Sequence, residues 1–97
     1  MSEIYFDEFR LIVIEQIRDI EQSGPETHSM EWFLLKYLRR IEMNARTPTT
    51  LASMENSMRA LIRFYVDMID EDSQLGDRCK MIYENYRRIT REAQAKN

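Results

Sequence analysis

The stretch PTTLASMENSMRALIRFYVDMID, residues 48–70, decides the fold class of this 97-residue chain. Its apolar side chains recur three and four residues apart, which is the spacing of a helical seam. We therefore predict one long helix over residues 48–70 that serves as the spine of the core, with Thr47 as its N-cap and Pro48 in its first turn. The seam consists of Leu51, Met54, Met58, Leu61, Tyr65 and Met68, and Ile62, Phe64 and Ile69 widen it.

The same spacing predicts three further helices, over residues 2–22, 29–45 and 77–93. The first should end at Gly24, which can adopt the left-handed conformation, because Pro25 cannot continue a helix. Ser29 is the expected N-cap of the second helix. The short connections predict antiparallel neighbours, so we expect a single all-α domain over residues 1–97, either a small up-down four-helix bundle or a more open helical array. The predicted inner faces are Phe6, Phe9, Val13, Ile17 and Ile20, then Met30, Leu34, Tyr37, Leu38 and Ile41, and finally Leu75, Cys79, Ile82, Tyr86, Ile89 and Ala93.

The composition is typical of a soluble helical domain. Only two glycines and two prolines occur, which favours long regular elements over loops. The single cysteine, Cys79, excludes an intrachain disulfide, and we expect it to be a buried thiol. The apolar run LIVI at residues 11–14 is too short for a membrane span or the core of a signal peptide. We therefore expect a cytoplasmic protein that does not enter the membrane.

Residues suited to catalysis are sparse. The one histidine, His28, falls in a predicted loop, and Cys79 faces the predicted core, so neither has an evident catalytic partner. The acidic run at residues 70–77 departs from a calcium-binding loop at Leu75, where glycine is required, and at Met81, where glutamate is required. We expect a protein that is not an enzyme and that uses no cofactor or metal. A remote alternative is an all-α, metal-dependent nucleotide hydrolase, based on the carboxylates of Asp67, Asp70, Glu71 and Asp72.

Charge alternates along the chain, because the first and third predicted helices are acidic and the second and fourth are basic. Each helix of an up-down bundle would then lie between helices of opposite sign, which predicts ion pairs at the surface.

Two surfaces stand out against this background. The outer face of the second helix combines a tryptophan with basic neighbours, a composition typical of interface hot spots. Whether Trp32 points outward or folds over the end of the bundle stays open. The back of the first helix carries surplus apolar residues, which favours homodimerisation. The predicted partner-binding residues are Trp32, Lys36, Arg39, Met43 and Arg46, and the predicted dimer interface is Ile4, Leu11 and Ile14.

These features favour a small protein-interaction module, acting as a regulator, adaptor or chaperone-like binder of another protein without catalysis. The seven methionines agree with adaptable contacts. The alternative is a nucleic-acid-binding regulator that uses the basic second and fourth helices, although the net charge of −3 disfavours general affinity for nucleic acid. The residues predicted for that alternative are Lys80, Arg87, Arg88 and Arg91.

Overall fold

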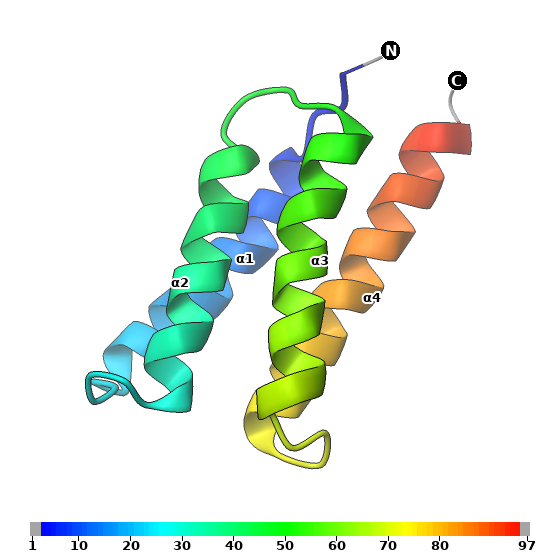
Figure 1. Ribbon diagram of the computed structural model, residues 1–97. Helices are drawn as coiled ribbons and strands as arrows, with labels where there is room; N and C mark the ends of the chain where they lie inside the picture. The colour runs from blue at the N-terminus through cyan, green and yellow to red at the C-terminus, as the bar shows by residue number, and fades with distance from the viewer. Residues whose placement is uncertain (1–2, 96–97) are drawn as a thin grey trace.

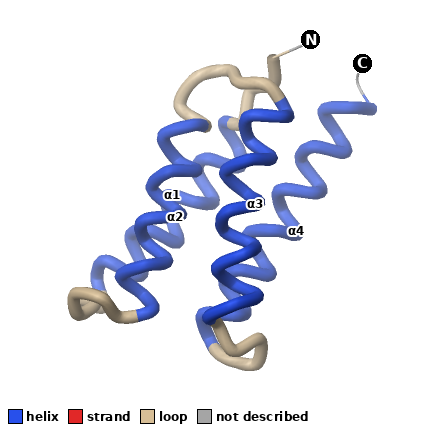
Figure 2. The backbone as a smooth tube through the Cα atoms, in the orientation of Figure 1, coloured by secondary structure: helices blue, strands red, loops and turns tan. Residues whose placement is uncertain are grey.

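The computed structural model describes residues 3–95, which form four helices joined by short loops (Figures 1 and 2). The helices run alternately up and down, so both ends of the chain lie at one end of the bundle (Figure 1). The predicted all-α class and four-helix arrangement are thus confirmed. The helices are α1 (Asp7–Gln22), α2 (Met30–Asn44), α3 (Leu51–Met68) and α4 (Gln74–Ala95).

Each helix packs mainly against two neighbours. Both α1 and α3 contact α2 and α4, so α1 and α3 lie diagonally across the bundle from each other. The bundle is elongated, with principal extents of 42 × 22 × 17 Å. None of the helices between residues 3 and 95 combines the length and the apolar character that a membrane crossing requires.

The predicted apolar stripes converge on the core of the bundle, except that Met30, at the start of the predicted stripe of α2, is 37% exposed. The side chains buried at its centre come from all four helices and include Phe9, Val13, Leu34, Leu38, Met58, Leu61 and Ile82. The seam of α3 departs from the prediction near its end, where Met68 is 54% exposed and Phe64 is buried instead. A straight helix with 3.6 residues per turn drifts by about 20° per heptad, so a strict seven-residue seam rotates away from the core along its length.

Two predicted helix starts are wrong for one shared reason. Ile4 and Thr49 form an antiparallel bridge. The Ile4 nitrogen lies 2.7 Å from the Thr49 carbonyl oxygen, and the Thr49 nitrogen lies 3.0 Å from the Ile4 carbonyl oxygen. This bridge keeps the segment before Phe6 extended, so α1 begins at Asp7, and the predicted start at Ser2 lies outside the described residues. It also holds Thr49 outside a helix, so Thr50 caps α3 by accepting from the Ser53 N–H at 3.1 Å.

The remaining helix ends follow local chemistry. Gly24 has φ of 64°, which confirms the left-handed end of α1, and the Ser29 hydroxyl accepts from the Trp32 N–H at 3.2 Å as a predicted N-cap should. The fourth helix begins at Gln74 rather than at residue 77, because the Ser73 hydroxyl accepts from the Gly76 N–H at 3.0 Å.

Candidate functional site

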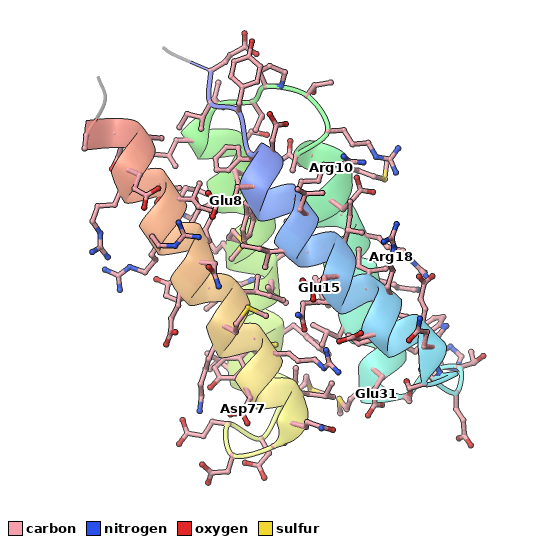
Figure 3. The ribbon with its side chains drawn as sticks, turned by 180° about the vertical axis from the view of Figure 1, so that it is seen from behind. Glu8, Arg10, Glu15, Arg18, Glu31 and Asp77 are labelled. Atoms are coloured by element: carbon pink, nitrogen blue, oxygen red, sulfur yellow. The ribbon has the colours of Figure 1, made fainter. Side chains whose placement is uncertain are left out.

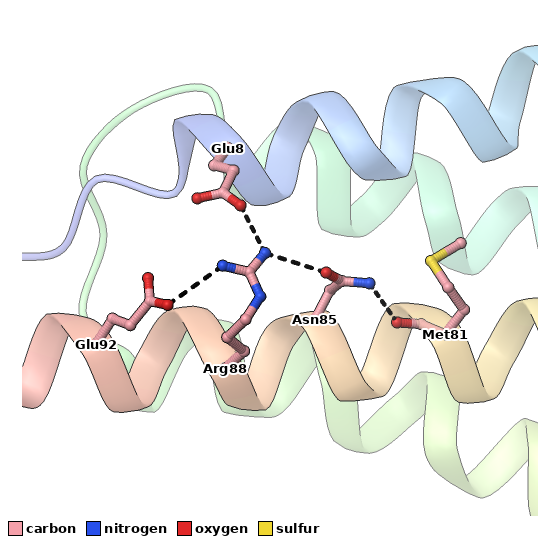
Figure 4. A network of polar contacts seen from close by, with 5 residues as sticks. All are labelled: Glu8, Met81, Asn85, Arg88 and Glu92. Carbon is pink, nitrogen blue, oxygen red and sulfur yellow. Dashed lines mark hydrogen bonds and ion pairs between the residues drawn. The ribbon is translucent and has the colours of Figure 1, made fainter.

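Acidic α1 lies between basic α2 and α4 and is paired with both. In Figure 3, Glu8 lies on the side of α1 that faces α4, and Arg10 lies on the side that faces α2. Figure 4 shows the Arg88 guanidinium of α4 bound to Glu8 and also to Glu92 and Asn85 of its own helix. The predicted ion pairing between neighbouring helices is therefore present around α1. The interhelical pairs are Arg10–Glu42, Arg39–Glu21, Arg78–Asp19 and Arg88–Glu8.

Glu42 is the most enclosed carboxylate of this network. It is 9% exposed and accepts from Arg10 at 2.9 Å and from Arg46 at 2.8 Å. The hydrogen bond from Arg46 is the main reason that the pKa of Glu42 is lowered to about 2; the Arg10 bond adds to it, and burial acts in the opposite direction. These groups are satisfied within the protein, so the network stabilises the α1–α2 pair.

The predicted partner-binding residues of α2 are largely occupied by intramolecular contacts. Trp32 is half-buried, with its ring centroid 4.8 Å from that of His28 and 5.0 Å from that of Phe33. The Lys36 ammonium lies 4.0 Å from the Trp32 ring centroid, which is a cation–π distance. Arg39 and Arg46 are paired with acidic residues, as described above, whereas Met43 is 63% exposed.

The structure brings part of the predicted dimer interface next to this face. Ile14 lines one groove together with Arg39, Met43 and Arg46, between α1 and α2. Leu11 is 64% exposed on α1. Ile4 precedes α1 and packs half-buried against the core, so it does not share a helical face with Leu11. Of the three predicted interface residues, Leu11 and Ile14 thus lie on α1 and Ile4 does not, and homodimerisation stays a prediction.

A different surface, between α3 and α4, is not evident from the sequence. We call it the α3–α4 groove, and it has a basic end and an apolar end that share Ile62 and Tyr83. The basic end is a pocket of about 280 Å³ that includes Glu55, Arg59, Arg87, Thr90 and Arg91 among its lining residues. The apolar end is a pocket of about 230 Å³ that adds Tyr65, Val66, Cys79 and Lys80.

The apolar end of the groove combines an exposed edge with a buried floor. Val66 is 69% exposed at its edge. Burial raises the pKa of the Cys79 thiol to about 11, so at neutral pH this side chain is a protonated, apolar part of the floor. The Lys80 ammonium is held by the Glu71 carbonyl oxygen at 2.8 Å.

The arginines at the basic end differ from the ion-paired arginines around α1. Within residues 3–95, Arg59, Arg87 and Arg91 form no ion pair, whereas five other arginines do. Arg18, Arg40 and Arg63 are also without an ion pair, but they do not line this pocket. The structure therefore divides the predicted nucleic-acid set: Lys80, Arg87 and Arg91 border the groove, and Arg88 points toward α1. The spacing of Arg87 and Arg91, one helical turn apart, was the sequence signal for this cluster, but the contribution of Arg59 depends on how α3 packs against α4.

No protein-family model matches the chain, and no curated protein or solved structure matches it either. Within the described range, no three His, Cys, Asp or Glu side chains are grouped as metal ligands would be. The interpretation of the α3–α4 groove consequently rests on its own geometry and charge.

Proposed function

We propose that this protein is a non-catalytic protein-interaction module, a small regulator or adaptor, whose α3–α4 groove binds an acidic amphipathic segment of another protein. The observation that carries the proposal is the combination of three arginines without ion-pair partners and an adjoining apolar floor. An amphipathic helix lying in such a groove would place apolar side chains on the floor and carboxylates beside the arginines.

The residue types at the groove also suit protein recognition. Arginine and tyrosine are enriched at the centres of interfaces, because both provide a large planar contact surface together with hydrogen-bond donors. The Arg87 guanidinium carbon lies 5.8 Å from the centroid of the Tyr83 ring, within the cation–π range.

Nucleic-acid binding is the second candidate function. It is favoured by the location of Lys80, Arg87 and Arg91 around one groove, since side chains of this kind contact phosphates. We prefer a protein partner because three arginines lie at one end of the groove and the other end is mainly apolar with a single lysine, whereas a polynucleotide would present phosphates along its whole length.

Two synthetic peptides test the proposal directly. One peptide places leucines on one face of a helix and glutamates on the opposite face. Its twin replaces every glutamate with lysine. With isotopically labelled protein, the acidic peptide should shift the amide signals of Val66 and Tyr83, and the basic twin should not. Equal shifts from both peptides would rule out the charge complementarity on which the proposal rests.

A pair of matched variants locates the peptide site. Val66→Glu puts a carboxylate at the groove and should weaken binding of the acidic peptide roughly tenfold or more. Met68→Glu introduces the same charge at another exposed position of α3 that does not line the groove, and it should leave binding unchanged. Equal losses in the two variants would place the peptide elsewhere. Tighter binding of duplex DNA than of the peptide, with a steep salt dependence, would favour the second candidate.

A further inference from the structure

We propose that the basic end of the α3–α4 groove is a phosphoryl-binding pocket, specific for a phosphorylated side chain on the acidic partner segment. This inference rests on the proposed function and names the chemical determinant that the groove recognises. Three arginines from two helices line the pocket: Arg59 from α3, and Arg87 and Arg91 from α4.

The charge of the pocket is not balanced within the protein. Its lining contains three guanidinium groups and one carboxylate, Glu55, which leaves an excess of two positive charges. Like charges gathered in one place repel each other unless an anion binds between them. A phosphate monoester carries about −1.5 to −2 charges at neutral pH, which matches this excess, whereas a carboxylate carries only one.

The single carboxylate of the pocket is already held by another group. The Tyr86 hydroxyl donates to Glu55 at 2.8 Å, and Tyr86 itself is 3% exposed. The Tyr86 ring packs against Phe6 and Phe9, with centroid distances of 6.3 and 5.5 Å. Burial, followed by the Glu55 hydrogen bond, raises the pKa of Tyr86, so its hydroxyl keeps the proton that it donates. Glu55 thus has a fixed partner that is not one of the arginines.

The remaining lining groups suit a ligand with several oxygen atoms. Arginine presents paired N–H donors in a planar fork, which fits phosphate oxygens in bidentate geometry. Tyr83 and Gln94 add a hydroxyl and an amide group to the same pocket, whereas the Thr90 hydroxyl donates to the Arg87 carbonyl oxygen at 3.1 Å. Its volume of about 280 Å³ approaches the lower end of ordinary small-ligand sites, so a single phosphorylated side chain is a suitable occupant.

The neighbouring apolar end favours a protein over a polynucleotide as the carrier of the phosphoryl group. Beyond Tyr83 the lining changes to Ile62, Tyr65, Val66 and Cys79, and the one lysine there is bonded to a backbone carbonyl. A phosphorylated residue followed by apolar side chains matches this change from basic to apolar, whereas a chain of phosphodiesters does not.

Phenyl phosphate and benzoate provide the first test, because they differ mainly in the anionic group. Titration of each into labelled protein is followed at the Nε–H signals of the arginine side chains. Phenyl phosphate should shift Arg59, Arg87 and Arg91 saturably, leave Arg18 unchanged, and bind roughly tenfold more tightly than benzoate. Equal affinity for the two compounds, or equal shifts at Arg18, would overturn the inference.

Matched variants test the arginines themselves. Arg87→Gln and Arg91→Gln should each weaken binding of phenyl phosphate roughly tenfold. Arg63→Gln removes the same charge from α3 at a position that does not line the pocket, and it should have no effect. Circular dichroism checks that each variant is folded. A loss of equal size in Arg63→Gln would mean that only the general charge matters, which would refute a built pocket.

The acidic peptide described above then separates this inference from the proposed function. It is prepared with a single phosphoserine at successive positions and compared with the unmodified peptide. Tighter binding of at least one phosphorylated form, abolished in Arg87→Gln, supports the pocket. Equal binding of all forms at Val66 and Tyr83 would refute the phosphoryl pocket and leave the protein-binding groove intact. An oligothymidylate that binds more tightly than every phosphopeptide would refute the inference in favour of nucleic acid.

Discussion

Replacing Gly76 with alanine gives two opposite expectations, and only one of them agrees with the structure. Alanine is a better helix former than glycine by about 1 kcal/mol, so helix propensity alone predicts a more stable protein. Gly76, however, is a buried residue in the first turn of α4, directly beside the turn that joins α3 to α4. A Cβ atom at this position would lie 2.5 Å from the Asp70 carbonyl oxygen and 2.7 Å from that of Glu71.

The magnitude follows from what the Cβ atom would displace. Both nearest atoms belong to the backbone, and the Asp70 carbonyl also accepts from the Ser73 N–H at 3.0 Å and from the Ser73 hydroxyl. These atoms cannot move aside as a flexible side chain can, so the cost is expected near the upper end of overpacking, about 3 kcal/mol. After subtraction of the propensity gain, Gly76→Ala should lower the free energy of unfolding by about 2 kcal/mol.

Urea unfolding followed by far-ultraviolet circular dichroism measures this difference, and the melting temperature should fall by about 10 °C. Gly24→Ala is the control, because nothing lies within 4 Å of its added Cβ atom and only the strain of φ at +64° remains, a cost of about 1–2 kcal/mol. A Gly76→Ala protein as stable as the parent would refute the close approach of α4 to the α3–α4 turn.

Three further predictions concern the other side of the bundle. Because the pKa of Glu42 is lowered from 4.5 to about 2, the stability it contributes is present above pH 4.5 and lost as pH falls toward 2. Its arginine partners are partly exposed, so Glu42→Gln should cost only roughly 1–2 kcal/mol at neutral pH and should flatten the pH dependence of urea unfolding; an unchanged pH profile would contradict this. Leu11→Glu should convert a homodimer into a folded monomer, and light scattering that shows a monomeric parent protein at high micromolar concentration would reject the dimer. Trp32→Ala should lower stability by about 2 kcal/mol, since the ring is half-buried against Phe33; a parent-like melting temperature combined with lost partner binding would instead make Trp32 an interface residue.

Local chemistry made most of the fold predictable. The apolar residues at helical spacing identified all four helices, and the ends at Gly24 and Ser29 follow from backbone conformation and a side-chain cap within a few residues. The starts of α1 and α3 could not be obtained in this way, because both depend on the bridge between Ile4 and Thr49. That bridge joins segments far apart in the chain, so no local pattern reports it.

The candidate site shows even more clearly which features follow from local sequence and which depend on tertiary packing. The sequence by itself determined that the second and fourth helices are basic and that Arg87, Arg88 and Arg91 lie on the fourth. Tertiary structure decided which of these arginines form ion pairs within the protein and which line the α3–α4 groove. Arg87 and Arg88 are adjacent, yet successive residues point about 100° apart around a helix. Packing of α4 between α1 and α3 therefore turns Arg88 toward Glu8 and leaves Arg87 at the groove. An arginine is neutralised or left available according to which helix it faces, and that depends on the rotation of each helix about its own axis within the bundle.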